Sequence, residues 1–183
     1  MLEKLAKGFL LPPKLHQAHD SLTKEQQSVL KQQPELQRQF EHRKIDEVLI
    51  LICGHGGRDS RCGTLGPILH SEFEDKLGRQ NVPVLTGPPE QTLGESNLNL
   101  ESYKPFARVG LISHIGGHKW AGNIIIYIPP SWKGHDLAGK GIWYGRVEPG
   151  NVEGIVEKTV MGGKVIADLF RGGIDAERNV LRM

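Results

Sequence analysis

Two cysteines and two histidines lie in glycine-rich stretches that each follow a run of apolar residues. Cys53 and Cys62 belong to "VLILICGHGGRDSRCG", and His114 and His118 belong to "VGLISHIGGHKWAGNIIIYI". Runs rich in β-branched residues are typical of strands, so we expect a strand to deliver the first residue of each pair and a loop to fold the second back beside it. Because thiolate and imidazole are soft to borderline ligands, the four residues together predict a metal or cluster site.

The spacing within the two pairs narrows the kind of site. Structural zinc sites usually contain a short C-x2-C to C-x4-C knuckle, whereas the cysteines here are spaced C-x8-C, which argues mildly against zinc. The histidines are spaced H-x3-H, but Gly116 and Gly117 between them each disfavour a helix by roughly 1 kcal/mol relative to alanine, so we expect a loop. Two thiolates on one iron and two imidazoles on the other are the ligand set of a Rieske-type 2Fe-2S centre. Arg58, Arg61 and Lys119 would add positive potential that favours thiolate.

Other interpretations of the same residues stay open. Cysteines in globular proteins are often buried as small apolar side chains that bind nothing. A structural Cys2His2 zinc domain would serve as an interaction module, and a thiol-disulfide oxidoreductase would use Cys53 and Cys62, although the C-x-x-C motif of such enzymes is missing. His55, two residues after Cys53, is a rival ligand. The remaining histidines are expected to be structural or solvated: His16, His19, His42, His70 and His135.

Composition bounds the size of the fold and the kind of partner. With 183 residues and 38% hydrophobic content, the chain can bury one core, or one core plus an appendage. Its 23 basic and 21 acidic residues give a net charge of +2 without a dense basic block, so nucleic acid is not indicated as a partner. The apolar runs are far shorter than the roughly 20 residues of a membrane span. Two cysteines are too few for a disulfide-stapled secreted domain, which favours a reducing compartment. The opening "MLEKLAKGFLLPP" has the features of neither a transit peptide nor a secretory signal.

The pattern of elements predicts an appendage at residues 1–46 and one domain at residues 47–183. The appendage should carry a short helix near residues 23–30, which Pro34 keeps from extending. In the domain, "VLILIC" predicts a strand buried on both faces, and apolar positions from Leu65 to Leu77 form one helical stripe that ends at Gly78. The sequence assigns no element to the polar, proline-containing residues 79–105, although a structureless loop of that length would be unusual. Three strands follow in "ARVGLISH", "NIIIYIPP" and "GIWYGRV", the last two as an antiparallel pair, and one or two helices close the domain.

The order strand, helix, three strands, helix predicts the fold class. With a crossover between the first two strands, it indicates an α/β fold of the thioredoxin-like type, with a mixed central sheet flanked by helices. Trp120, Trp143 and Tyr144 could form a partner-docking patch, but aromatic residues beside strands more often belong to the core. Arg146 could form a hydrogen bond near the site or simply end a strand.

Several phrases of the sequence resemble a known family. The combination of "GRDSRCG", "SHIGGHKWAGN" and "GIWYGRVEP" closely resembles the sucrase/ferredoxin-like family of fungi and plants, whose C-terminal domains are similar to thioredoxin-fold ferredoxins. Over about residues 48–174, "ILHSEFEDKL" and "GGKVIADLFRGGI" look most like the fungal "altered inheritance of mitochondria" branch.

The resemblance implies a function and a ligand assignment. It implies a non-Rieske 2Fe-2S protein in which Cys53 and Cys62 bind one iron and His114 and His118 bind the other. It further implies a thioredoxin-like ferredoxin domain that carries electrons rather than catalysing a reaction, with a redox protein as its partner. The same branch implies a place in the mitochondrial matrix and a role in redox homeostasis.

Overall fold

The computed structural model describes residues 1–57, 59–88 and 103–183, without the side chain of His118, and these residues form two compact units, Met1–Lys44 and Ile45–Met183. The first unit is helical, with α1 (Leu2–Leu5) continued by η1 (Ala6–Leu10), then η2 (Gln17–His19), α2 (Lys24–Leu30) and η3 (Pro34–Gln39). At the start of α2, Thr23 Oγ1 accepts a hydrogen bond from the Gln26 N–H, and the Gln26 side chain accepts one from the Thr23 N–H. This capping box explains why the helix expected near residues 23–30 begins where it does.

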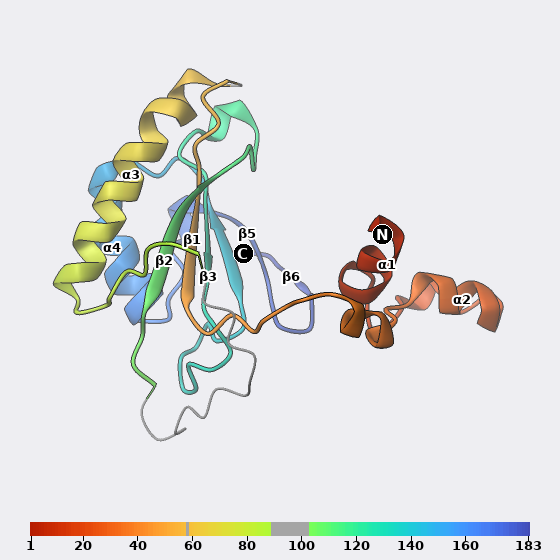
Figure 1. Ribbon diagram of the computed structural model, residues 1–183. Coiled ribbons are helices and arrows are strands. Elements are labelled where there is room, and N and C mark those ends of the chain that lie inside the picture. Colours follow the sequence, from red (N-terminus) through yellow and green to blue (C-terminus); the bar gives the residue numbers. More distant parts are fainter. Residues whose placement is uncertain (58, 89–102) are drawn as a thin grey trace. The chain divides into compact units, whose positions relative to one another are not determined.

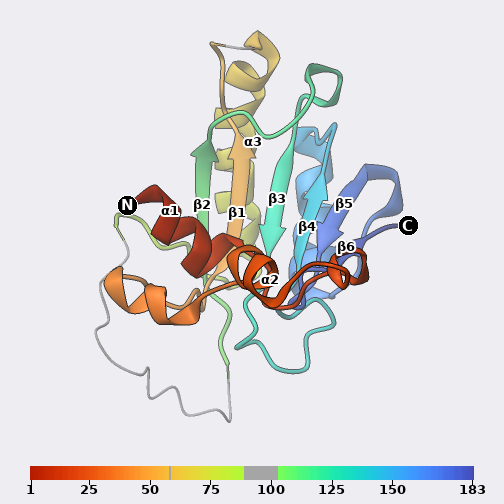
Figure 2. The same cartoon turned by 90° about the vertical axis from the view of Figure 1, so that its right-hand side faces the viewer.

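The second unit is built on a six-stranded sheet. Its strands are β1 (Val48–Cys53), β2 (Ala107–Ile112), β3 (Ile124–Tyr127), β4 (Gly141–Tyr144), β5 (Phe170–Ile174) and β6 (Val180–Leu181). They lie in the order β2-β1-β3-β4-β5-β6, and Figure 2 shows β2 to β5 in this order from left to right. β1 pairs in parallel with β2, and every other neighbouring pair is antiparallel.

Two helices lie on the same side of this sheet (Figure 1). α3 (Ser60–Arg79) connects β1 to β2, and α4 (Val152–Ile155), continued by η6 (Val156–Met161), follows β4. Short helical turns complete the unit: η4 (His118–Trp120), η5 (Pro149–Asn151) and η7 (Ala167–Leu169). A parallel β-α-β unit followed by an antiparallel pair and a helix is the reduced thioredoxin pattern, so the predicted α/β fold with a mixed sheet flanked by helices is confirmed.

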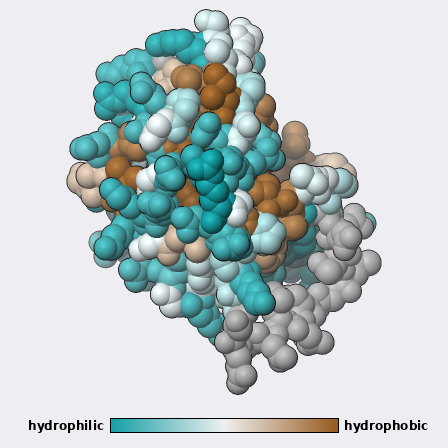
Figure 3. Space-filling view, turned by 90° about the vertical axis from the view of Figure 1, so that its left-hand side faces the viewer, coloured by the Kyte–Doolittle hydropathy of each residue, from teal (hydrophilic) through white to brown (hydrophobic). Residues whose placement is uncertain are grey.

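The core lies between the helices and the sheet. Alternate residues of the central strands are fully buried: Val48, Ile50, Ile52, Ile124, Ile126, Ile142 and Tyr144. Leu69, Phe73 and Leu77 of α3 belong to the same hydrophobic cluster. Leu49 and Leu51 alternate with the buried residues of β1 and are only partly buried, so the expectation that this strand is buried on both faces is wrong. β1 has an antiparallel neighbour and shows the alternation of a sheet packed by helices on one face. The outer surface of the helical layer is mostly hydrophilic, with separate hydrophobic patches (Figure 3).

Two elements differ from the sequence predictions. α3 begins at Ser60, before the apolar stripe, so Cys62 lies in the first helical turn rather than in a loop. The closing segment, expected to be helical, also contains β5 and β6. Pairing with β4 forms a strand from the glycine-rich "FRGGI", whose intrinsic β-propensity is low.

Two further expectations concern the connections and the membrane. Within residues 79–105, the structure describes 79–88 and 103–105, where an isolated parallel bridge joins Val84 to Ala107; residues 89–102 lie outside the described part. No helix among the described residues is long and apolar enough to cross a bilayer.

Candidate functional site

Cys53 and Cys62 lie side by side in the fold. Cys53 is the last residue of β1, Cys62 is in the first turn of α3, and each is only 2% exposed. Their side chains are hydrogen-bonded to each other, and neither is part of a disulfide. The structure therefore brings two of the four predicted ligands together as a buried pair of thiols.

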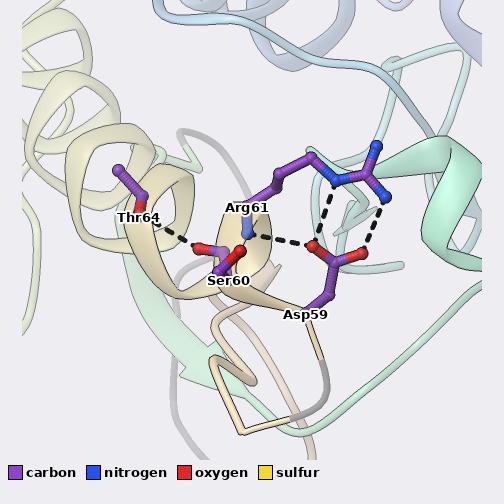
Figure 4. A network of polar contacts seen from close by, with 4 residues as sticks. All are labelled: Asp59, Ser60, Arg61 and Thr64. Atoms are coloured by element: carbon purple, nitrogen blue, oxygen red, sulfur yellow. Dashed lines mark hydrogen bonds and ion pairs between the residues drawn. The ribbon is translucent and has the colours of Figure 1, made fainter.

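The start of α3 sets the position of Cys62 (Figure 4). Asp59 Oδ1 accepts a hydrogen bond from the Arg61 backbone N–H at 2.9 Å, which caps the helix. The Arg61 guanidinium donates to both carboxylate oxygens of Asp59, at 3.1 and 2.8 Å. One turn on, the Thr64 hydroxyl donates to the Ser60 carbonyl at 3.0 Å. Asp59 in "RDSRCG" is the sequence signal that the helix starts before the apolar stripe, because aspartate is a preferred N-cap residue.

Close packing between α3 and the loop after β1 brings the two sulfur atoms together. A Cβ on Gly63 would lie 2.7 Å from the Cα of Gly56, and one on Gly66 would lie 2.9 Å from the Cα of Gly54. A side chain at either helical position would push α3 away from the loop. The two glycines thus permit the approach of Cys62 to Cys53.

The loop between β2 and β3 reaches Cys62 through a backbone group. The Gly122 N–H donates a hydrogen bond to the Cys62 sulfur. Gly122 has a φ of +86°, and a Cβ there would collide with the backbone of Val147, whose N–H donates to the Gly122 carbonyl at 3.1 Å. Only glycine fits this position, and its N–H would stabilise a thiolate at Cys62.

The environment of Cys62 keeps its thiol protonated at neutral pH. The pKa of Cys62 is raised to about 11, and burial is the largest cause. The hydrogen bond with Cys53 and the negative charges of Cys53 and Asp59 contribute to this rise, and the Gly122 N–H opposes it. Reactive thiols of disulfide oxidoreductases have lowered pKa values, so this environment does not support that alternative. A metal ion would take the place of the proton, and its binding would release that proton.

The two histidines belong to the loop at the same end of the sheet. Ile112, the last residue of β2, pairs with Cys53, and His114 follows two residues later. The Nδ1 atom of His114 is buried. His118 opens the turn η4, and its side chain lies outside the described part of the structure. Figure 2 shows this loop at the end of the sheet where β1 stops and α3 starts.

Asn123 is a buried polar residue at this site that sequence reasoning missed. It is 1% exposed, and its carbonyl accepts a hydrogen bond from the Cys53 N–H at 3.0 Å. Its Oδ1 accepts one from the Trp143 indole N–H at 3.2 Å, and a Cβ on Gly116 would lie 2.8 Å from the same atom. Asn123 therefore joins β1, β4 and the histidine loop. The sequence signal that could have identified Asn123 is its position as a polar residue directly before the apolar run "IIIYI".

Of the other histidines, His55 is a rival ligand, whereas His70 and His135 have structural contacts. Among the side chains that the structure describes, which do not include that of His118, no three of His, Cys, Asp and Glu converge closely enough to hold a metal ion. His55 Nδ1 is buried without a hydrogen bond to the described residues, so His55 stays a rival ligand. His70 contacts Glu74 at 3.3 Å, and His135 Nε2 lies 2.9 Å from the Val160 carbonyl, as expected of structural histidines.

The chain is similar to a known protein family and to curated fungal proteins. A family model described as Sucrase/ferredoxin-like matches residues 2–172. Two curated relatives are named altered inheritance of mitochondria protein 32. The protein from Debaryomyces hansenii is 40% identical over 135 residues, covering 74% of this chain and 39% of the relative. The protein from Meyerozyma guilliermondii is 36% identical over 137 residues, covering 75% of this chain and 38% of the relative. The chain thus spans a little over a third of the length of these relatives.

A solved structure is also similar to this chain. It is the thioredoxin-like [2Fe-2S] ferredoxin of Aquifex aeolicus, with 16% identity and a TM-score of 0.43, covering 69% of this chain and 97% of that protein.

Proposed function

This chain belongs to the sucrase/ferredoxin-like family, and we propose that it is an electron-transfer protein that binds a 2Fe-2S cluster. In this proposal Cys53 and Cys62 bind one iron, and His114 and His118 bind the other. The observation that carries it is the buried, hydrogen-bonded pair of thiols with the Gly122 N–H directed at one sulfur. When bound, such a cluster takes up and gives back one electron.

The cysteine end of the site fits this group. The two thiols are already side by side, as ligands of the same iron must be, and the close packing of α3 against the loop after β1 holds them there. The Gly122 N–H would donate to a metal-bound thiolate, and hydrogen bonds to cluster sulfurs are one of the means by which proteins set the potential. Burial of both cysteines limits access of water to that end of the site.

The histidine end is supported by the path of the backbone. β2 runs parallel to β1 and ends beside Cys53, so the segment that follows starts at the site. Asn123 and Gly116 hold the middle of this segment against β3 and β4. A neutral imidazole is an accepted ligand of one iron in 2Fe-2S centres.

Two rival functions, a zinc domain and a thiol-disulfide oxidoreductase, each differ from an iron-sulfur protein in a measurable property. A structural zinc domain would use the same four residues, but zinc is colourless, whereas iron-sulfur proteins are red-brown. A thiol-disulfide oxidoreductase would need a thiolate at neutral pH, and the raised pKa of Cys62 opposes that state.

We further propose that the protein acts in the mitochondrial matrix, with a redox protein as electron donor or acceptor. The names of the curated relatives support an association with mitochondria.

Metal analysis tests the proposal. The full chain is purified without oxygen, and its iron, acid-labile sulfide and zinc contents are measured together with its visible absorption. We expect iron and sulfide in equal amounts, two of each per chain, and their loss in Cys53→Ala and Cys62→Ala. His70→Ala, which alters a histidine of α3 outside the site, is the matched control and should keep both. Zinc without sulfide would overturn the proposal in favour of the zinc domain.

A variant of His55 tests the rival ligand. If His118 and not His55 is the fourth ligand, His55→Ala should keep the iron and sulfide that His118→Ala loses or holds only weakly. Loss of iron and sulfide in His55→Ala but not in His118→Ala would make His55 the fourth ligand in place of His118.

A further inference from the structure

Three cationic side chains surround one tryptophan next to the candidate site. The Arg171 guanidinium carbon lies 3.3 Å from the centre of the Trp120 ring, that of Arg146 lies 4.4 Å away, and Lys119 Nζ lies 5.0 Å away. Lys119 and Arg146 are exposed, and Trp120 and Arg171 are partly exposed. We call these four residues the Trp120 platform.

The backbone is shaped to hold Arg171 against the ring. In β5, Phe170 pairs with Tyr144 and Gly172 pairs with Trp143, so Arg171 is the extra residue of a β-bulge. Bulges redirect a side chain out of the regular alternation of a strand. A Cβ on Gly145 would lie 3.0 Å from the Cγ and Cδ atoms of Arg171. Because glycine has no side chain, the Arg171 side chain can pass over position 145.

Arg146 is held by an unusual backbone conformation. Its φ is +59°, a left-handed value that costs energy for a residue other than glycine. Its N–H lies 3.4 Å from the Trp120 carbonyl in a hydrogen bond that fixes the two residues to each other. The bulge and this turn, from different parts of the chain, both bring a guanidinium to the same ring.

The platform carries positive charge that the described part of the chain leaves without an ion pair. Among the described residues, none of Lys119, Arg146 and Arg171 forms an ion pair with a carboxylate, and the buried Nε of Arg171 has no hydrogen-bond partner. The ring face attracts each cation, but three like charges still repel one another. A ligand that brings carboxylates would relieve this repulsion and pair the guanidinium groups.

The platform is joined to the candidate site by a very short piece of chain. Trp120 ends the turn that His118 begins, and Gly122, whose N–H reaches the Cys62 sulfur, follows two residues later. A partner bound to the platform would therefore lie against the loop that carries the proposed histidine ligands.

We propose that the Trp120 platform docks the carboxylate-rich surface of a partner protein. Tryptophan and arginine dominate the binding energy of protein interfaces, and a positive patch facing a negative one accelerates association. That the partner is an electron donor or acceptor rests on the proposed function; that it presents carboxylates rests on the platform alone.

A short acidic peptide tests the platform without requiring a cluster. Binding of fluorescein-labelled hexaglutamate to the full chain is followed by fluorescence anisotropy at low and at high salt. We expect binding at low salt that high salt abolishes, because exposed charges are screened. The double variant Lys119→Glu/Arg146→Glu should weaken binding by about tenfold or more.

A matched control removes the effect of net charge. Lys133→Glu/Lys158→Glu makes the same change in charge at exposed lysines that do not contact Trp120, one between β3 and β4 and one in η6, and should bind hexaglutamate within about twofold of the unaltered chain. Circular dichroism of both double variants establishes that they are folded. Equal weakening by the two double variants, or no binding at low salt, would overturn the proposal.

Two comparisons complete the test. A hexathymidylate probe carries negative charge and stackable bases; tighter binding of this probe than of hexaglutamate at the platform would assign it to nucleic acid and overturn a protein partner. Iron and sulfide are measured in each preparation, so an absent cluster with intact peptide binding would contradict the proposed function and leave the docking proposal supported.

Discussion

At the scale of single residues, the chemistry of the site rests on two buried thiols that lie side by side. Cys53 and Cys62 share a hydrogen bond and lie out of contact with bulk water. Burial disfavours a bare thiolate but not one that is bound to iron, because the metal supplies the compensating charge. The raised pKa of Cys62 is therefore compatible with metal binding and opposed to nucleophilic use.

The reduction potential of the cluster should depend on whether His114 and His118 bind its iron. In His114→Cys or His118→Cys, a thiolate replaces a neutral imidazole and adds a negative charge, which disfavours uptake of an electron. We expect the potential to fall, in the direction of the roughly 250 to 700 mV that separates Rieske centres from four-cysteine ferredoxins. Protein-film voltammetry measures it. His55→Cys serves as the control and should leave the potential unchanged; a fall in that variant alone would make His55 the ligand.

Sequence reasoning identifies residues that carry their own chemistry and misses those that act through the fold. The cysteines and histidines are evident from type and spacing, and the structure brings Cys53 and Cys62 together. Asn123 and Gly122 are not evident, since their roles depend on which backbone groups of β1 and α3 lie opposite them. Arg171 reaches Trp120 only because of a bulge, which depends on the register between β4 and β5.

At the scale of elements, the first turn of α3 connects helix stability to the site. Asp59 caps this turn and forms an ion pair with Arg61 across it, with its own side chain only 7% exposed. The position of Cys62 depends on that turn and on its packing against the loop after β1.

Removal of the cap should destabilise the protein. We expect Asp59→Ala to lower the free energy of unfolding by about 0.5 to 2 kcal/mol, the usual range for loss of an N-cap. Asp59→Asn keeps a capping oxygen and should cost less. Urea denaturation of both variants measures the difference, and equal losses would mean that the ion pair, rather than the cap, stabilises the turn.

Two glycines of the same helix should respond in opposite ways to alanine. A Cβ at Gly63 meets the backbone of Gly56, so Gly63→Ala should destabilise the fold by about 1 to 3 kcal/mol and lower iron content. A Cβ at Gly78 meets nothing within 4 Å, so Gly78→Ala should stabilise α3 by up to about 1 kcal/mol. Urea denaturation and iron analysis check both variants. Similar behaviour of the two would contradict the close packing that brings Cys62 to Cys53.

The spacing of apolar residues predicted that the central strand and helix exist better than it predicted where the helix begins. "VLILIC" forms the strand it predicts, because a β-branched run bounded by glycine has few alternatives. The stripe from Leu65 to Leu77 marks the buried face of α3 but not its start, which Asp59 determines one turn earlier. β5 could not be read from "FRGGI", because its pairing with β4 and not its own propensity makes it a strand.

At the scale of the whole molecule, a buried polar chain ties the end of the sheet to the closing helix. The Tyr144 hydroxyl and Thr159 Oγ1 lie 2.7 Å apart, and the Thr159 hydroxyl donates to the Lys164 carbonyl at 2.9 Å. The Ile166 N–H donates to the Tyr144 oxygen at 3.0 Å. Since Thr159 donates to the carbonyl, Tyr144 is the donor to Thr159, and each hydrogen of the chain is used once.

Loss of the Tyr144 hydroxyl should weaken the fold and change its response to alkali. Tyr144→Phe leaves the Ile166 N–H without an acceptor and should cost about 1 to 3 kcal/mol at neutral pH. Burial raises the pKa of Tyr144 above its ordinary 10.0, so the folded state favours the neutral phenol. This contribution to stability is complete below pH 10 and is lost as the pH rises toward the folded-state pKa.

Denaturation by urea at neutral and at alkaline pH measures both effects. Tyr144→Phe should lose less stability between the two pH values than the unaltered chain loses. Tyr127→Phe, at a partly buried tyrosine outside this chain of hydrogen bonds, is the control and should cost little at neutral pH. Equal neutral-pH losses in the two variants would show that the buried hydrogen bonds do not support the fold.

The order of strands and helices was sufficient to predict the thioredoxin-like arrangement, because a crossover between parallel strands followed by an antiparallel pair allows few topologies. The two-sided burial expected of β1 was wrong, since its antiparallel neighbour and the single helical layer follow from contacts that a strand's own sequence does not contain.

The most direct test of the account is the detection of histidine nitrogen at the reduced cluster. Pulsed electron paramagnetic resonance of the dithionite-reduced protein measures magnetic couplings to nitrogen nuclei bound to the paramagnetic centre. We predict couplings from two histidine nitrogens, one of which disappears in His114→Cys and the other in His118→Cys, while both persist in His55→Ala. A reduced cluster without ligand-nitrogen couplings, or with couplings that neither cysteine variant alters, would contradict ligation by two cysteines and two histidines.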